Sequence, residues 1–357
     1  MTDELAGEAP FRYQHTASFA ELLEQLGATL FVTTYQAGKL AAFRAADGKL
    51  SLLLRTFDRA MGLAVNAREM AIATRYQIWF LPNEPSLAQR IPPQGTHDAC
   101  FLPRRSHVTS NIDTHEIAWG SSESNPNAAQ SPELWLVNTR HCCLGTLDDR
   151  FSFVPRWKPP FVEQLQRADP CHLNGLAMAN GRPKYVTCFV ETNTPEGWRE
   201  HKRDGGCLID VETNEVVARG FSMPHSPRVH NGRVWLLDSG RGALVTVDSR
   251  TGQSDVVAQL PGYPRGLTLV GRYAFVGLSQ ARESKTFGGV AVVEQLPQRR
   301  CGVWCVDTLA GEIVGFLEFE QNVAEVFDVQ LLFGFRNPAI IGFAKETIER
   351  ASVMPPL

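Results

Sequence analysis

Three histidines lie at or just before the first strand of three consecutive repeats in the sequence, and imidazole is a side chain that binds transition metals and transfers protons. His115 stands in DTHEIAW, His172 in CHLNGLAM and His225 in MPHSPRV. Each comes at the start of a short apolar segment of the same kind. Three imidazoles that meet at one point commonly hold a catalytic Zn, Cu or Fe ion with an open coordination position. We therefore predict that His115, His172 and His225 bind one transition metal ion, either Cu, Fe or Zn.

Other polar residues flank the same apolar segments and their following turns. Positively charged and amide side chains at these places suit an anionic or peptide-like substrate, because guanidinium groups pair with carboxylate and phosphate. Carboxylate, phenol and imidazole groups there suit proton transfer. The predicted substrate-binding residues are Arg59, Arg228, Arg265, Asn174 and Gln36, and the predicted catalytic residues are Glu116, Tyr35 and His141.

A structural role is the alternative for each of these residues. A histidine at such a position can simply hydrogen-bond to a neighbouring segment. The arginines can pair with acidic residues of the same rim, namely Asp113, Glu116, Glu325 or Asp328. The chain has no HExxH, paired CxxC, GxxxxGK, GxSxG or strand-following GxGxxG motif, so no local signature supports a metalloprotease, nucleotide, serine-hydrolase or dinucleotide site.

The elements that position these residues are short strands in a fixed order. Six apolar segments each begin a repeat, and the second residues of successive segments are 40 to 62 residues apart in the chain. A second strand follows each of the first five, and third and fourth strands that end near Asp or Gly come next. This period is typical of four-stranded antiparallel blades, so the sequence predicts an all-β, six-bladed β-propeller. The six first strands are 61–65, 115–119, 174–178, 225–229, 265–269 and 327–331.

Both ends of the chain are needed to complete one blade. The N-terminal part starts with a helix over 18–26, which Ser18 and Glu21 are expected to cap, followed by a second strand over 29–34. The C-terminal part ends with a first strand and the segment 339–344. We expect residues 1–16 to be a tail and residues 17–357 to form one domain. A β-sandwich with long loops is the alternative, but it does not explain six similar intervals.

Some segments fall outside the repeat. The stretch 97–107 (HDACFLPRRSH) is expected to be a connecting loop. The inserts 196–204 and 280–300 are expected to be solvated loops, a lid or a partner-binding surface.

Composition excludes several classes of protein. The chain has 357 residues with 43% hydrophobic and 20% charged residues, which is typical of a globular protein and not of a disordered one. The formal net charge of -3 gives no general reason to bind nucleic acid or an anionic membrane. No apolar run is long enough to span a bilayer, and the acidic N-terminus does not resemble a signal peptide. We expect a cytoplasmic protein whose eight cysteines are thiols.

Two resemblances add to this interpretation. The motifs TYQAGKL, RAMGLAV, DTHE, CHLNGLAM, MPHSPR, PRGL and FDVQLL together resemble an uncharacterised bacterial family of conserved hypothetical, propeller-like proteins. This resemblance covers nearly the whole chain beyond about residue 16, implies the propeller fold and implies no activity. His115, His172, His225, Arg265 and Tyr35 are also similar in type to the constellation of the peptidyl-hydroxyglycine lyase domain of peptide amidation, which is a six-bladed propeller with a metal held by three histidines.

We therefore predict a metal-dependent enzyme with oxidoreductase or lyase chemistry on a small anionic or peptide-like substrate. The alternative is a noncatalytic propeller that binds a protein or peptide partner at its rim. A lactonase-like hydrolase with an all-oxygen Ca site is a third possibility that rests on Asn174, Glu116 and Asp328, but the imidazoles at the rim do not favour it.

Overall fold

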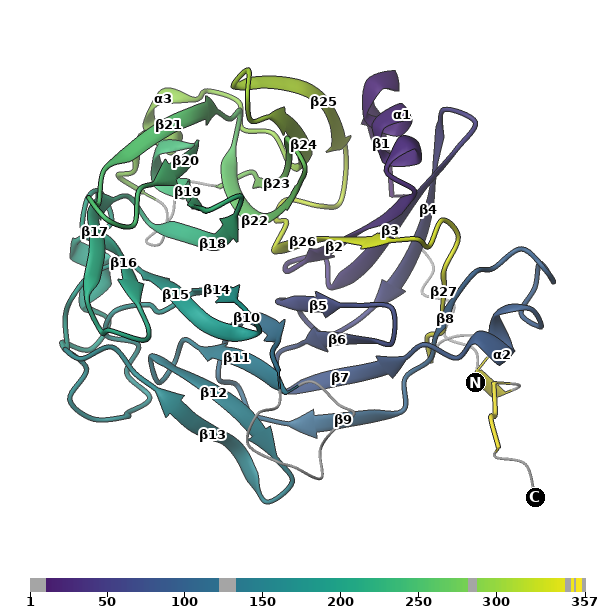
Figure 1. Ribbon diagram of the computed structural model, residues 1–357, viewed down its shortest axis with the longest axis horizontal. Coiled ribbons are helices and arrows are strands. Elements are labelled where there is room, and N and C mark those ends of the chain that lie inside the picture. The colour runs from purple at the N-terminus through teal and green to yellow at the C-terminus, as the bar shows by residue number, and fades with distance from the viewer. Residues whose placement is uncertain (1–10, 122–132, 282–287, 344–347, 350, 355–357) are drawn as a thin grey trace.

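Six four-stranded antiparallel sheets are arranged in a ring, so the predicted six-bladed propeller is confirmed. The structure is a computed structural model that describes residues 11–121, 133–281, 288–343, 348–349 and 351–354. Figure 1 shows the sheets around a common centre, toward which the first strand of each blade faces. Every pairing within a blade is antiparallel, and the strands follow one another from the inside outward.

The strands of the first three blades are as follows. Blade 1 orders β26 (Asp328–Phe333), β2 (Ala28–Thr34), β3 (Lys39–Ala46) and β4 (Lys49–Thr56). Blade 2 orders β5 (Leu63–Val65), β6 (Glu69–Ala73), β7 (Gln77–Pro82) and β9 (Arg105–Val108). Blade 3 orders β10 (Thr114–Trp119), β11 (Leu134–Asn138), β12 (Cys143–Asp148) and β13 (Phe151–Trp157).

The other three blades repeat this order. Blade 4 contains β14 (Gly175–Ala179), β15 (Arg182–Cys188), β16 (Gly206–Asp210) and β17 (Val216–Phe221). Blade 5 contains β18 (Pro224–His230), β19 (Arg233–Asp238), β20 (Ala243–Val247) and β21 (Ser254–Gln259). Blade 6 contains β22 (Tyr263–Val270), β23 (Tyr273–Ser279), β24 (Gly302–Asp307) and β25 (Glu312–Phe319).

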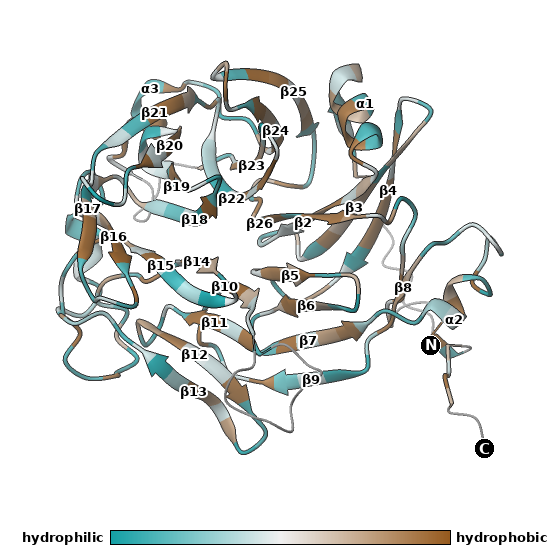
Figure 2. Cartoon of the chain, viewed as in Figure 1, coloured by the Kyte–Doolittle hydropathy of each residue, from teal (hydrophilic) through white to brown (hydrophobic). Residues whose placement is uncertain are grey.

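Middle strands of the blades are deeply buried and mainly apolar because both faces of each blade are covered by its neighbours. All seven residues of β2 and all six of β24 are buried. Two-sided burial replaces the alternation of a one-sided sheet by a continuous apolar run. The outermost strands are more polar, and Figure 2 shows brown along β6 and β7 against teal on β9 and β13.

Blade 1 is closed by both ends of the chain, as predicted. The C-terminal β26 pairs with the N-terminal β2 along six residues, from Ala28 opposite Phe333 to Thr33 opposite Asp328. A further N-terminal strand, β1 (Tyr13–His15), adds a fifth strand to blade 6 by pairing with β25. This strand lies in the segment that we expected to be a tail, of which residues 1–10 are outside the described part of the chain.

The N-terminal helix is α1 (Ala17–Gln25), and Thr16 caps it instead of Ser18. The Thr16 hydroxyl accepts from the Phe19 backbone N–H at 3.3 Å. The Ser18 hydroxyl donates to Thr16 Oγ1 and to the Val314 carbonyl. The prediction was wrong by two residues because Thr16 and Ser18 both suit the cap position, and contacts with blade 6 decide between them.

The stretch 97–107 is more than a loop. Its end begins β9, which is the fourth strand of blade 2, and β8 (Cys100–Phe101) pairs in parallel with β27 (Ala339–Ile340). Between β7 and β8 lies the short helix α2 (Pro85–Ala88). The remaining helical segments are η1 (Gly197–Glu200), η2 (Ser239–Arg241) and α3 (Ala291–Gln295), and no described helix is long and apolar enough to cross a membrane.

Candidate functional site

One cavity of about 300 Å³ opens at the centre of the ring and contains the three predicted histidines. The ring centroids of His115 and His172 are 4.8 Å apart, and those of His115 and His225 are 6.5 Å apart. Tyr35 and Arg265 line the same cavity. The other lining residues are Asp113, Arg140, Asp169, Phe189, Trp198, Arg199, Met223, Tyr263, Glu325 and Phe327.

A repeated backbone bend sets up this cavity. Four consecutive blades carry a residue with positive φ at the same place in the repeat: Arg59, Asp113, His172 and Met223, with φ from 50° to 56°. Such a conformation costs free energy for a residue other than glycine, on the order of 1–3 kcal/mol, and clusters at functional sites. In blades 3 and 5 the bend directs its own carbonyl at the histidine two residues later. In blade 4 the histidine itself occupies the bend.

The His115 ring has its Nδ1 atom fixed by two acceptors. The Asp113 carbonyl lies 3.0 Å from Nδ1, and Thr139 Oγ1 lies 2.8 Å from it. The Thr139 hydroxyl donates its proton to the Leu173 carbonyl at 2.6 Å, so it can only accept from the ring. Nδ1 therefore carries the proton. The Nε2 atom, which has no hydrogen-bond partner among the described residues, is left with a free lone pair.

The His225 ring repeats this arrangement in blade 5. Its Nδ1 atom donates to the Met223 carbonyl at 2.9 Å and to Ser239 Oγ at 3.0 Å. The Ser239 hydroxyl donates to the Pro264 carbonyl at 2.6 Å, which again leaves it as an acceptor for the ring. His225 therefore has the same tautomer as His115, with Nε2 free.

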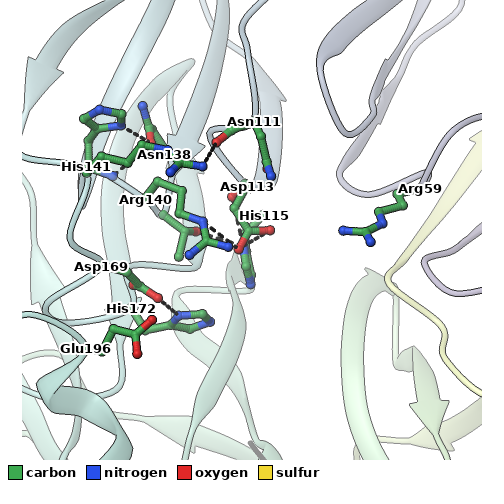
Figure 3. A network of polar contacts seen from close by, with 12 residues as sticks. Arg59, Asn111, Asp113, His115, Asn138, Arg140, His141, Asp169, His172 and Glu196 are labelled. Carbon is green, nitrogen blue, oxygen red and sulfur yellow. Dashed lines mark hydrogen bonds and ion pairs between the residues drawn. The ribbon is translucent and has the colours of Figure 1, made fainter.

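The His172 ring is oriented by a buried carboxylate. Its Nδ1 atom donates to Asp169 Oδ2 at 2.9 Å, and Trp198 Nε1 donates to the same oxygen at 3.1 Å. Figure 3 shows Asp169 and His172 facing each other. The ring stacks on Phe189 at 4.5 Å and lies 4.6 Å from Trp198. Trp198 belongs to η1 in the insert 196–204, so this insert forms a fixed wall of the cavity.

Burial keeps two of the three rings neutral. Burial lowers the pKa of His115 to about 3, and Asp113 only partly opposes this shift. Burial and then the Arg265 charge lower the pKa of His225 well below its ordinary value. Both rings therefore have an unprotonated nitrogen at neutral pH, which is the form that binds a metal ion or accepts a hydrogen bond.

Arg265 is a cation that makes no hydrogen bond or ion pair with the described residues. Its guanidinium lies 3.4 Å from the centroid of the Phe327 ring, and its Nη2 atom is buried without a hydrogen bond. The other two arginines of the cavity lie near acids: Arg199 pairs with Glu196, and Arg140 Nε is 3.9 Å from an Asp113 oxygen. A buried guanidinium with an open donor is suited to bind an anion.

Tyr35 lines the cavity, whereas Arg59 lies outside it. The Tyr35 ring stacks on Phe327 at 5.6 Å, and the exposed Arg59 donates to its hydroxyl at 3.3 Å. Figure 3 shows Arg59 across from the network of Asp113, His115 and Arg140. Arg59 can therefore orient Tyr35 but does not line the pocket.

Glu116 and Arg228 belong to a different group, which we call the axial cluster: Glu116, Arg228 and Asp328. Arg228 pairs with Glu116 and lies 3.9 Å from Asp328, so it has the structural role that was the alternative for an arginine of the rim. Each carboxylate also accepts a backbone N–H of the next blade: Leu176 N donates to Glu116 at 2.8 Å and Leu63 N to Asp328 at 2.9 Å. None of the three residues lines the cavity.

Glycines face the acids of the axial cluster. A Cβ atom at Gly62 would lie 3.0 Å from the Glu116 Cα atom, and one at Gly266 would lie 2.9 Å from the Asp328 Cα atom. Gly266 also has a φ of +82°, which glycine adopts without strain. At these two places, the second residue of a predicted first strand packs closely against the first strand of the neighbouring blade.

The remaining predicted residues also lie outside the lining of the cavity. Asn174 Oδ1 accepts from the Thr187 hydroxyl at 2.7 Å. Gln36 Oε1 accepts from the Ala324 N–H at 3.4 Å. His141 lies beside Asn138, with Nδ1 3.1 Å from Oδ1, and burial followed by the Arg167 charge lowers its pKa. Their predicted roles in binding and proton transfer stay predictions.

The geometry of the three rings sets what metal binding requires. Among the described residues, no group of three His, Cys, Asp or Glu side chains is already arranged as a metal site. A tetrahedral ion with metal–nitrogen bonds of about 2.0–2.1 Å would hold the ring centroids about 5 Å apart. His115 and His172 meet this spacing, whereas His225 must approach His115 by about 1 Å. Imidazole nitrogens are common ligands of transition metals, and the metal site stays a prediction.

The side chains that orient the three rings were not among the predicted site residues. Thr139 and Ser239 end second strands, and Thr33 and Ser279 do so too. Each of these four hydroxyls donates to a backbone carbonyl of the next blade: Thr33 to Met61, Thr139 to Leu173, Ser239 to Pro264 and Ser279 to Val326. This recurrent Ser or Thr was a usable signal. In blade 4 the equivalent place, directly after β15, is occupied by Phe189. Asp169 carries no such signal, because it lies in an irregular segment that the repeat does not align.

The solved structures that resemble this chain share the fold at low sequence identity. One, described as the crystal structure of a nidogen/laminin complex, has a TM-score of 0.54 and 9% identity, covering 85% of this chain and 97% of that chain. Another is a protein of unknown function from Bacteroides caccae, with a TM-score of 0.50 and 9% identity, covering 85% and 98%. At this identity the likeness shows the propeller architecture alone.

Family membership is clearer than these likenesses. No curated protein matches the sequence. A family model described as a domain of unknown function matches residues 17–341, which is almost the entire propeller. The chain therefore belongs to the DUF4915 family.

Proposed function

We propose that the central cavity is the active site of a metal-dependent enzyme. His115, His172 and His225 hold one transition metal ion, either Cu, Fe or Zn, and Arg265 binds the anionic group of a small or peptide-like substrate. The observation that carries this proposal is the shared state of the three rings. Each Nδ1 donates to an oxygen of the protein, and each Nε2 is free beside one cavity.

This state is the one that metal-binding histidines have. A ligating imidazole usually donates its other N–H to a carboxylate or a backbone carbonyl, which fixes the tautomer and the ring orientation. Here the acceptors are Asp169 Oδ2 and the carbonyls of Asp113 and Met223. Hydroxyl groups of Thr139 and Ser239 add a second acceptor to two rings. Three independent blades therefore present the same nitrogen to the cavity.

The residues of the chain supply binding and proton transfer. A bound transition metal would act as a Lewis acid or redox centre, which is compatible with the lyase or oxidoreductase chemistry that we propose. Arg265 binds the anionic group, and the aromatic rings of Phe189, Trp198 and Phe327 exclude water around it. Tyr35 is the proton donor or acceptor that lines the cavity, and Arg59 orients its hydroxyl.

Elemental analysis of full-length protein purified without a metal-binding tag tests the proposal. We expect close to one transition metal ion per chain, and a loss of that ion in each of the variants His115→Ala, His172→Ala and His225→Ala. His201→Ala is the matched control, since this exposed histidine lies outside the cavity and should leave the metal content unchanged. Folded protein that neither contains nor takes up Cu, Fe or Zn would overturn the proposal.

A noncatalytic propeller that binds a protein or peptide at its rim is the second candidate. The absence of a preformed metal arrangement among the described residues favours it. It predicts no stoichiometric metal and no loss of folding or partner binding in the three histidine variants. The same elemental analysis therefore separates the two functions.

A cytoplasmic location stays part of the proposal. The eight cysteines are all free and buried in the structure, which agrees with a reducing compartment.

A further inference from the structure

Half of the cysteines form a row of thiols in the wall behind the cavity. Cys142, Cys171, Cys188 and Cys207 are all fully buried in one core cluster between blades 3 and 4. Within the row, the Cys188 and Cys207 sulfur atoms are hydrogen-bonded to each other. The other four cysteines lie outside this cluster.

Cys188 and Cys207 are the closest pair of the row. They stand directly opposite each other on the antiparallel strands β15 and β16, and their sulfur atoms are 3.2 Å apart. Opposite residues of such strands have Cα atoms about 4.5–5.5 Å apart, which lies within the range of about 4.4–6.8 Å that a disulfide needs. The two sulfurs can therefore bond without a change in the strand register.

We propose that Cys188 and Cys207 form a cross-strand disulfide when a hydroperoxide reaches the thiol row. The Cys188 thiol gives up its proton and its sulfur attacks the peroxide, so an S–O bond forms as the O–O bond breaks. The products are a sulfenic acid and an alkoxide or hydroxide, which takes up that proton and leaves as one alcohol or water molecule. The Cys207 thiol then attacks the Cys188 sulfur, the S–S bond forms, and the departing hydroxide takes the thiol proton as water. Two thiols and one hydroperoxide thus give one disulfide, one alcohol or water, and one water.

The neighbours of this pair connect it to the cavity. Cys171 lies in the same core cluster as Cys188 and Cys207. Cys171 precedes His172 in the chain. Phe189, which follows Cys188, stacks on His172 and lies 5.2 Å from the His225 ring centroid. Oxidation of the row therefore changes the packing behind two of the three histidines.

Counting thiols in the full-length, chelator-treated protein tests this proposal independently of any metal. Hydrogen peroxide is the probe, and the protein is then unfolded, alkylated with iodoacetamide and weighed. Untreated protein should take up one alkyl group on each of its eight thiols, and oxidised protein should lose two of them. Peptide mapping should locate the link between Cys188 and Cys207, and dithiothreitol should restore all eight.

Variants separate the proposed pair from general oxidation. Cys207→Ser should abolish the link at Cys188 and Cys207. Cys305→Ser is the control, because Cys305 is equally buried but lies in another core cluster, and this variant should still lose two thiols. Wild-type protein that keeps all eight thiols, or that forms its disulfide between residues outside the row, overturns the proposal even if both variants fold poorly.

Discussion

The cavity and the axial cluster are two polar regions built by the same repeat, yet they differ in how completely their groups are paired. In the axial cluster, Arg228 donates to Glu116 and to the Leu267 carbonyl, and both carboxylates accept backbone N–H groups. In the cavity, Arg140 Nε, Asp169 Oδ1 and Arg265 Nη2 are buried without a hydrogen-bond partner among the described residues. Neighbouring positions of the same repeat thus place hydrogen-bonded polar groups in the axial cluster and polar groups with open hydrogen-bonding capacity in the cavity.

We infer from this difference that the axial cluster has a structural role and that the cavity is the better place for a ligand. A buried polar atom without a partner costs roughly 1–3 kcal/mol, and a bound ligand can supply the missing partner. The axial cluster needs no such partner. In the proposed function, an anion would pair with the open donor of Arg265.

The largest effect is expected from Arg228→Met in the axial cluster. Removing the guanidinium leaves Glu116 and Asp328 buried without their cation, so the free energy of unfolding should fall by about 3–5 kcal/mol. Urea unfolding of the variant and the wild type measures this difference. An unchanged midpoint would show that the axial cluster is not structural.

The loss in Arg228→Met should also depend on pH. Burial raises the pKa of Glu116 to about 7 and raises that of Asp328, and Arg228 opposes both shifts. Without Arg228, both folded-state pKa values rise further above those of the unfolded chain. Stability is then retained below the unfolded pKa values and lost as the pH rises through the folded ones. The deficit should therefore be smaller at about pH 5 than at about pH 8.

Asp169→Asn should weaken metal binding while leaving the three ligands in place. The variant replaces the carboxylate that accepts from His172 Nδ1 by a neutral amide, and loss of such a group typically lowers metal affinity about 10–100-fold. Competition with a chromophoric chelator measures the affinity. Asp148→Asn, in an exposed turn of blade 3, is the control and should bind as the wild type does.

Arg265→Met repeats the arginine-to-methionine change in the cavity and should have the opposite effect on stability. The variant removes a buried cation that has no ion-pair partner among the described residues. The free energy of unfolding should therefore stay within about 1 kcal/mol of the wild type or increase. Anion binding, followed by calorimetry with acetate and phosphate, should be lost. A destabilisation as large as that of Arg228→Met would contradict the distinction between the two regions.

The smallest effect is expected from two hydroxyl groups with equivalent places in the fold. Ser239→Ala and Ser279→Ala each remove a hydrogen bond to the next blade, worth about 1 kcal/mol. Only Ser239 also contacts a histidine, so only its variant should weaken metal binding. Equal metal affinities in the two variants would show that Ser239 does not position His225 for metal binding.

The repeat explains why so much of the architecture could be predicted. Six similar segments gave the number of blades, the strand order and the closure of blade 1 by both termini, because each blade must bury the same faces. The same register assigned the three histidines to one rim, and the structure brings their rings into one cavity.

Other features depend on contacts that the repeat does not encode. Ser226 is the residue of blade 5 that is equivalent to Glu116, and His225 precedes it by one residue. The direction of each side chain nevertheless places Glu116 in the axial cluster and His225 in the cavity. Thr16 caps α1 because blade 6 engages Ser18. Asp169 and Trp198 meet His172 from irregular segments whose packing is set by tertiary contacts.

Closure by both termini determines when the cavity can exist during synthesis. The blades that carry the three histidines emerge from the ribosome well before β26, which must wait for translation of residue 333. Phe327, which stacks on Tyr35 and supports Arg265, also emerges late. A nascent chain therefore exposes the imidazoles before the cation and the aromatic wall are assembled around them, and the complete pocket forms only when the ring shuts.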